Sequence, residues 1–168
     1  MKNQTKAIDT PFGRRDAYGA LSMPVYHTAA YEFDTAADMA DAFTGRVIAP
    51  DYSRVMNPTV TYFEDKVKAV TGAHAVVAMS SGMAAISGTL LALAGAGKNI
   101  VTSRHMFGNT FSLITQSLTR FGVEARTCDL LDLAEVERRI DDNTCCLFLE
   151  IITNPQMEVA DLAALAEI

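Results

Sequence analysis

The sequence has little positive charge, few cysteines and few histidines, and each shortage argues against a class of function. Its 168 residues include 14 Lys and Arg against 20 Asp and Glu, which gives a net charge of -6. General affinity for nucleic acid or anionic membrane is therefore not expected. The cysteines and histidines, three of each, lack the paired spacing of a zinc site. We interpret Cys128, Cys145 and Cys146 as buried thiols, with the adjacent pair pointing to opposite faces of a strand.

Long apolar runs and the common nucleotide motifs are also missing. No segment approaches a membrane span, and the N-terminus lacks the apolar core of a secretory signal, so a cytoplasmic location is expected. Residues 95–98 resemble the end of a P-loop, but position 92 is alanine and no Ser or Thr follows Lys98, so we interpret them as a helix end and turn. The loop at 80–83 offers Gly82 where a dinucleotide fingerprint has three glycines, so NAD is not expected.

Hydrophobic residues make up 49% of the chain, which is enough for a globular core. Residues 1–58 are polar and rich in turn-forming residues, with one helix expected at 35–43. We expect them to form an extended arm that lies on a partner subunit. The periodic pattern that follows predicts helices at 58–71, 82–94, 109–121, 132–140 and from 161, and strands at 75–79, 99–103, 123–127 and 144–150.

The predicted strands are short continuous apolar runs, which are typical of a parallel sheet covered on both faces. Right-handed crossovers then predict a doubly wound α/β domain at residues 59–168. The last apolar helix has no cap and no closing strand after it, so we expect an incomplete domain.

Ligands of such sheets bind beyond the carboxyl ends of the strands, where three polar loops are predicted at 80–83, 104–109 and 150–155. The first loop places Ser81, Gly82 and Met83 at the start of a helix. Free N–H groups and the helix dipole favour an anion there. A plain serine cap explains Ser81 equally well.

Other candidate residues also allow a purely structural interpretation. Phe107 could stack on a flat ring or pack in the core. Glu150 ends an apolar strand and must be paired if it is buried. Asn154 precedes a proline, which favours extended backbone, and could equally be a turn residue. Tyr52 and Arg54 point the same way in an extended segment and could bind a phosphate, or could be ordinary surface residues.

Taken in order, these segments resemble the Cys/Met-metabolism family of pyridoxal-phosphate (PLP) enzymes. The segments that carry the resemblance are Tyr52-Ser53-Arg54 with Asn57-Pro58-Thr59, Ser81-Gly82-Met83-Ala84-Ala85-Ile86, Phe107-Gly108-Asn109-Thr110, and Glu150 with Asn154-Pro155. The resemblance implies a fold-type-I PLP-dependent transferase large domain, mostly parallel and incomplete, preceded by the N-terminal arm.

The resemblance also implies cofactor contacts. Ser81, Gly82 and Met83 would bind the PLP phosphate through backbone N–H groups. Tyr52 and Arg54 would reach the cofactor of a neighbouring subunit in a homo-oligomer, a dimer of dimers in the family.

Three further roles follow from the resemblance. Phe107 stands where the family usually has a tyrosine stacked on the pyridine ring, so stacking is kept and the acid or base function of the phenol is lost. Asn154 would sit by the phenolic oxygen of the ring. Glu150 would support the residues that contact the cofactor.

Segments 107–110 and 152–161 look most like those of O-acetylhomoserine sulfhydrylases, with methionine gamma-lyase close behind. The expected reaction is replacement at the gamma carbon of O-acetylhomoserine by a sulfur donor to give homocysteine; methionine gamma-lyase and cystathionine gamma-synthase or lyase activities are alternatives. The family's cofactor-binding lysine lies in a Ser-x-Thr-Lys context that no lysine here matches, so these residues alone are not expected to complete catalysis. A non-catalytic partner of a full-length homologue, and an α/β domain for another phosphate ligand, remain open.

Overall fold

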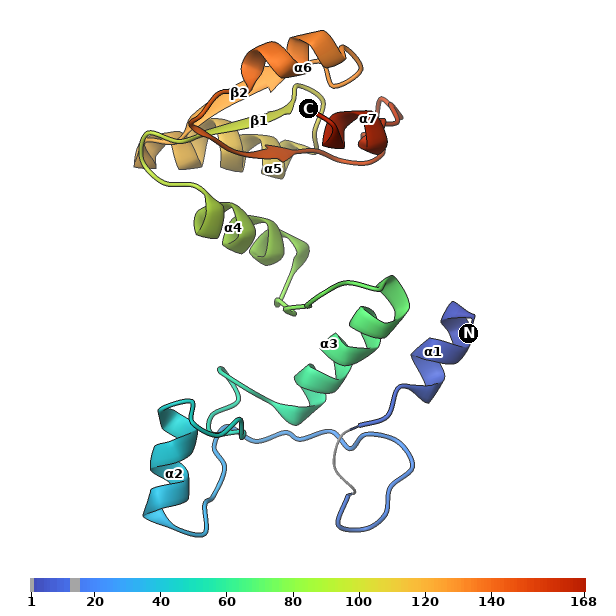
Figure 1. Ribbon diagram of the computed structural model, residues 1–168, viewed down its shortest axis with the longest axis vertical. Coiled ribbons are helices and arrows are strands. Elements are labelled where there is room, and N and C mark those ends of the chain that lie inside the picture. Colours follow the sequence, from blue (N-terminus) through green and yellow to red (C-terminus); the bar gives the residue numbers. More distant parts are fainter. Residues whose placement is uncertain (1, 13–15) are drawn as a thin grey trace. The chain divides into compact units, whose positions relative to one another are not determined.

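The computed structural model describes residues 2–12 and 16–168 (Figure 1). The chain folds as two compact units, residues 1–78 and 79–168. Within the described residues, no helix combines the length and the apolar character needed to cross a bilayer.

The first unit contains α1 (Asn3–Asp9), α2 (Ala36–Phe43) and α3 (Pro58–Thr71). The predicted helices α2 and α3 are confirmed, and each begins with a side-chain cap. Thr35 accepts from the N–H of Asp38, and Asn57 accepts from the N–H of Thr59. Pro58 occupies the first position of α3, where its missing N–H costs nothing.

Helix α1 was not predicted, because it has no side-chain cap and buries no residue, so no pattern marks it in the sequence. It packs against α3. After it, the hydroxyl of Tyr62 donates to the carbonyl of Thr10 over 2.8 Å, and the Phe12 ring meets Tyr62 edge to face at 5.8 Å between centroids. The arm is therefore less extended than predicted.

The predicted strand at 75–79 is wrong. These residues form irregular backbone, and the N–H of Ala78 donates to the Glu64 carboxylate over 2.7 Å instead of to a neighbouring strand. A strand needs a partner with which to pair, and the apolar run predicts only that the segment could be buried.

The second unit is a three-stranded parallel sheet in the order β2-β1-β3, with helices between the strands. Its elements are α4 (Gly82–Leu93), β1 (Asn99–Ser103), α5 (Gly108–Ser112), the π-helical η1 (Leu113–Ser117), the 3-10 helix η2 (Leu118–Phe121), β2 (Glu124–Cys128), α6 (Leu133–Arg139), β3 (Thr144–Phe148) and α7 (Leu162–Ala166). Every residue of the central strand β1 is buried. The prediction of a parallel sheet from continuous apolar runs is confirmed.

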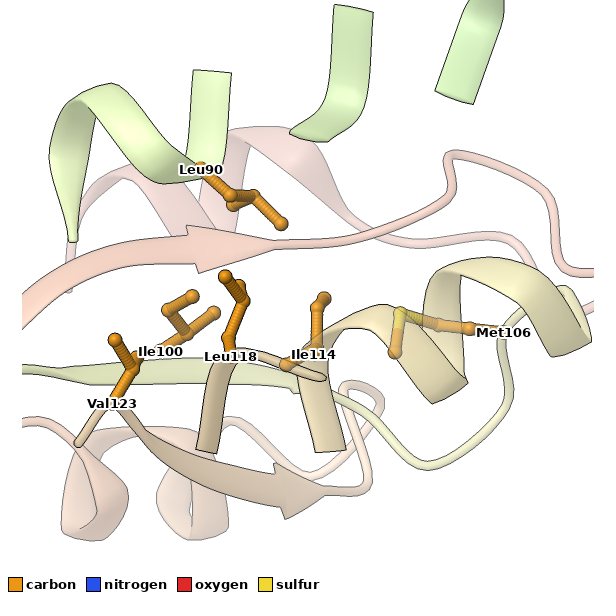
Figure 2. Close-up of a cluster of buried hydrophobic side chains, with 6 residues drawn as sticks. All are labelled: Leu90, Ile100, Met106, Ile114, Leu118 and Val123. Atoms are coloured by element: carbon orange, nitrogen blue, oxygen red, sulfur yellow. The ribbon is translucent and has the colours of Figure 1, made fainter. Parts of the chain in front are cut away.

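Two apolar clusters cover the two faces of this sheet. Figure 2 shows the first cluster, which combines Leu90, Ile100, Met106, Ile114, Leu118 and Val123. The second contains Val101, Cys128, Leu130, Val136 and Leu165. The neighbours Ile100 and Val101 belong to different clusters because successive strand residues point to opposite faces. Helices therefore lie on both faces, and the doubly wound α/β prediction is confirmed.

The helix predicted at 109–121 is a run of three shorter helical segments rather than one α-helix. The hydroxyl of Thr115 donates to the backbone carbonyl of Phe111 over 2.8 Å, and the hydroxyl of Thr119 donates to the backbone carbonyl of Gln116 over 3.0 Å. Threonine hydroxyls that bond back to the preceding turn loosen and bend α-helices, which accounts for the irregular segment.

The prediction that Cys145 and Cys146 point to opposite faces is wrong. Asn99 pairs with Thr144 and Ile100 with Cys146, so Cys145 is an extra residue in the strand pairing. This irregularity interrupts the alternation, and both cysteines pack against the first cluster. Cys128 is fully buried as predicted, whereas Cys145 and Cys146 are half-buried.

Candidate functional site

The carboxyl ends of the three strands carry polar loops, where ligands of parallel sheets bind. Side chains from these loops line one small cavity: Ser103, Leu130, Leu131, Glu150, Thr153, Glu158 and Ala160. The end of β1 and the segments that follow β2 and β3 therefore meet at this cavity. Of the three predicted loops, only 150–155 contributes to its lining, and the segment after β2 was not predicted.

Phe107 and Glu150 meet at this edge of the sheet. The backbone N–H of Phe107 donates to Oε1 of Glu150 over 2.8 Å, so the loop after β3 holds the residue that precedes α5. The Phe107 side chain remains 53% exposed, which leaves its ring free to contact a ligand. Glu150 is half-buried rather than fully buried, and the group it pairs with is the backbone N–H of Phe107.

The start of α4 combines a cap with free N–H groups. The Ser81 hydroxyl accepts from the N–H of Ala84 over 3.1 Å, so Ser81 is the serine cap. Among residues 2–12 and 16–168, no acceptor pairs with the N–H of Gly82 or Met83. The Met83 sulfur lies 3.8 Å from the Thr110 hydroxyl, which places the start of α4 beside the start of α5.

Asn154 is an exposed turn residue. The N–H of Met157 donates to the carbonyl of Thr153 over 2.9 Å, and the Asn154–Pro155 peptide bond is cis. The turn alternative from the sequence therefore describes its backbone. The Asn154 side chain makes no hydrogen bond within the described part of the chain.

Two side-chain pairs at the same edge were not singled out from the sequence. Arg104 donates to Glu135 over 2.7 Å. His105 donates through Nδ1 to Oε2 of Glu158 over 2.8 Å. Each pair joins residues more than 30 positions apart, and a single sequence carries no signal for such contacts. Arg104 therefore already binds a carboxylate through one of its guanidinium nitrogens.

Glu135 is held in its charged form at this edge. The backbone N–H of Asp129 donates to its Oε2 over 3.0 Å and, with the guanidinium groups of Arg104 and Arg139, keeps the pKa of Glu135 below its usual value. The carboxylate therefore stays available to bind Arg104 across the neutral pH range.

The thiols of Cys128 and Cys146 are poor nucleophiles. Burial raises the pKa of Cys128. Burial, together with the neighbouring Cys145, raises the pKa of Cys146 to about 12. A thiol that stays protonated at neutral pH is a weak nucleophile, so the packing role is the better description. The described residues contain no group of three or more His, Cys, Asp or Glu positioned to hold a metal.

Tyr52 and Arg54 lie in the first unit, in a turn rather than the predicted extended segment. The N–H of Val55 donates to the carbonyl of Tyr52 over 2.8 Å, which closes the turn. The Arg54 guanidinium nevertheless lies 5.1 Å from the centroid of the Tyr52 ring, so the two side chains share one side. Both residues are exposed.

A polar network fixes the segment that carries this pair. Antiparallel pairing joins Ala30 to Tyr52, and Ser53 donates through its hydroxyl to the carbonyl of Thr28. The Asn57 amide donates to Tyr26 over 2.9 Å and to Ser53 over 3.0 Å. The matched segment Asn57-Pro58-Thr59 thus contributes the cap of α3 and anchors the Tyr52 turn.

Comparison with known proteins identifies one family for the chain. The family model described as Cys/Met metabolism PLP-dependent enzyme matches residues 4–168. An L-methionine gamma-lyase of Fusobacterium nucleatum is 40% identical over 92% of this chain and 39% of its own length.

Two solved structures are also similar. A Campylobacter jejuni protein assigned as an O-acetylhomoserine (thiol)-lyase, whose structure contains a pyridoxyl-lysine monophosphate, has a TM-score of 0.89 and 34% identity. The similarity covers 96% of this chain and 40% of the Campylobacter jejuni chain. An O-acetylhomoserine sulfhydrylase of Wolinella succinogenes is 50% identical over 66% of this chain and 31% of its own, with a TM-score of 0.65.

The chain spans about 40% of the length of the first two relatives. The match over residues 4–168 and the shared fold nevertheless agree with the segments that carry the resemblance. The chain therefore belongs to the Cys/Met metabolism family of PLP-dependent enzymes.

Proposed function

We propose that these residues are the N-terminal part of an enzyme that replaces the acetate of O-acetylhomoserine with a sulfur donor to give homocysteine. The 50% identity to the Wolinella succinogenes O-acetylhomoserine sulfhydrylase supports this substrate. The activity belongs to the whole protein, because the relatives are more than twice as long as the matched region.

The observation that carries the cofactor assignment is the free start of α4. The N–H groups of Gly82 and Met83 have no acceptor in the described chain, and the helix dipole adds partial positive charge there. A Cβ added at Gly82 would have no heavy atom within 4 Å, so a ligand can approach the backbone here closely. These residues fit the phosphate of PLP, with the Ser81 side chain already used as the cap.

Three residues at the strand ends suit the ring of the cofactor. The exposed Phe107 ring can stack on the pyridine, and Glu150 fixes the Phe107 backbone from the next loop. Asn154 is assigned to the phenolic oxygen of the ring. When bound, PLP supplies an electron sink for the substrate carbanion.

Tyr52 and Arg54 are assigned to the cofactor phosphate of a neighbouring subunit. The pair offers a hydroxyl and a guanidinium on one exposed side of the chain, and both groups can donate to phosphate oxygens. In the whole protein, Arg54→Ala should weaken PLP binding about tenfold or more, since a charge-assisted bond contributes roughly 1.5–3 kcal/mol. An Arg46→Ala control should not, because Arg46 pairs with Asp41 on the surface.

Residues 1–168 by themselves are not expected to turn over substrate. The lysines present are Lys2, Lys6, Lys66, Lys68 and Lys98, and none lies in the Ser-x-Thr-Lys context that the family uses to hold PLP. Binding of PLP by these residues alone would therefore be reversible and non-covalent. Reduction with borohydride followed by peptide mapping tests this, and a pyridoxyl adduct on one of the five lysines would contradict it.

Methionine gamma-lyase activity is the second candidate, because the Fusobacterium nucleatum lyase is 40% identical over 92% of the chain. The two reactions separate in one assay of the purified whole protein. O-acetylhomoserine with sulfide should give homocysteine and acetate, whereas methionine alone should give 2-oxobutanoate, ammonia and methanethiol. Higher kcat/KM for the first reaction supports the proposal, and higher kcat/KM for the second replaces it.

A further inference from the structure

Two side-chain hydrogen bonds join the loop after β1 to the loop after β3. The first is the bond from the Phe107 N–H to Glu150. The second is the 2.8 Å bond from Nδ1 of His105 to Oε2 of Glu158. None of the roles assigned above explains the second bond. Its acceptor, Glu158, is the last residue of the turn 153–158, which contains Asn154.

Both ends of the His105–Glu158 bond are themselves fixed. The backbone N–H of His105 donates to the hydroxyl of Ser103, the buried last residue of β1, over 2.9 Å. The N–H of Glu158 donates to the hydroxyl of Thr153, and the N–H of Thr153 donates back to the carbonyl of Glu158, both over 3.0 Å. Thr153 is only 5% exposed. The bond therefore connects the rigid end of β1 to a closed turn.

Among the described residues, no other charged side chain forms an ion pair with His105 or Glu158. Arg104, the neighbour of His105 and a stronger partner for a carboxylate, is bound by Glu135 at 2.7 Å. Glu158 is about a third exposed, so its bond to His105 competes with water and is of moderate strength. A bond of this strength suits alignment of a loop more than stability of the whole fold.

We propose that His105 and Glu158 form a positioning pair that fixes the turn 153–158 and, through it, the Asn154 side chain next to the bound cofactor. The inference rests on the proposed function for the role of Asn154. Asn154 directly follows the buried Thr153, so movement of Glu158 is transmitted through one closed turn. Neither residue of the pair is assigned a contact with PLP or substrate.

The test uses the whole protein and four variants: His105→Ala, Glu158→Gln, the exchange His105→Glu with Glu158→His, and Glu167→Gln. Glu167 is an exposed control whose side chain bonds no described residue. Amide hydrogen exchange of residues 151–160 reports the turn without cofactor. The Kd for PLP, followed by its visible absorbance, reports the consequence for the site.

Each single variant should exchange about two- to fivefold faster in residues 151–160 and bind PLP about two- to fivefold more weakly, as expected for a partly exposed pair. The exchanged pair restores the contact with reversed direction and should bring both values back to within about twofold of the parent. Glu167→Gln should change neither value.

Three results would overturn the inference: unchanged exchange in the single variants, an exchanged pair no better than either single change, or altered exchange with an unaltered Kd for PLP. A parent protein that binds no PLP would instead reject the proposed function, and the positioning role with it. The two failures are therefore distinguishable.

Discussion

At the scale of single residues, Phe107 is the most informative difference from the pattern of the family. Its exposed ring keeps the surface needed for stacking and has no hydroxyl to exchange a proton. In the whole protein, Phe107→Ala should weaken PLP binding about tenfold, because aromatic stacking contributes roughly 0.5–1.5 kcal/mol beyond burial. Phe107→Tyr should leave the Kd for PLP unchanged. Equal Kd values for the alanine variant and the parent would remove Phe107 from the site.

Asp141 connects a buried strand end to the surface charges, and its effect depends on pH. It accepts from Arg126 over 2.7 Å and from the buried Asn99 over 2.9 Å. The bond to Arg126, with those of Asn143 and Asn99, lowers the pKa of Asp141 from 3.8 to about 2. Since the folded pKa lies below the unfolded value, the stability it contributes is present above about pH 4 and is lost toward pH 2.

We therefore expect Asp141→Asn to lower the free energy of unfolding at neutral pH. Urea unfolding of parent and variant from about pH 7 to pH 2 should show the difference shrinking below about pH 4. Asp142→Asn is the matched control, because the Asp142 carboxylate bonds no described residue. A difference that is constant over this pH range would contradict the charge-based explanation.

At the scale of elements, the Ser81 cap links stability to the proposed phosphate site. Replacing Ser81 with alanine removes the acceptor for the Ala84 N–H and should cost about 1 kcal/mol of unfolding free energy. Ser80→Ala should cost less than about 0.5 kcal/mol, since it removes no bond among the described residues. Denaturant unfolding measures both, and a larger effect at Ser80 would reassign the cap.

Gly122 ends the helical run before β2 with a positive φ of +79°. A Cβ there would also lie 3.2 Å from the Cβ of Ala96, so Gly122→Ala combines backbone strain with crowding. We expect a loss of about 1–2 kcal/mol or more in unfolding free energy. Gly97→Ala has the strain alone, with nothing within 4 Å, and should cost less. Equal losses of unfolding free energy in Gly122→Ala and Gly97→Ala would show that the contact with Ala96 adds no cost.

The sequence predicted β1, α3 and α4 well because caps and periodic patterns are local. Asn57 before Pro58 and Ser81 before Gly82 mark helix starts that need no tertiary information. The prediction of a strand at 75–79 was wrong because strand pairing depends on residues far away in the sequence. The extra residue Cys145 in the pairing of β1 with β3 was not predicted for the same reason. In the candidate site, motif order singled out Phe107 and Glu150, whereas only the structure shows that they are bonded.

At the scale of the whole molecule, residues 1–168 expose surface that a stable monomer normally covers. Leu91 and Leu93 on α4 are more than half exposed, as are Ile151 and Val159 beyond β3. In the described sheet, β2 and β3 are both edge strands, each with one side open to further pairing. Apolar patches and open strand edges favour association with other chains.

We therefore expect residues 1–168, expressed alone, to self-associate, bind a hydrophobic dye and unfold over a broad temperature range. The same measurements on the whole protein provide the control, where a sharp transition and little dye binding are expected because these surfaces are covered. Size-exclusion chromatography and calorimetry would test this. If the 168-residue chain is monomeric, unfolds in a sharp, reversible transition and binds no dye, the expectation is wrong. The exposed apolar side chains and open strand edges would then not require burial by another segment or chain.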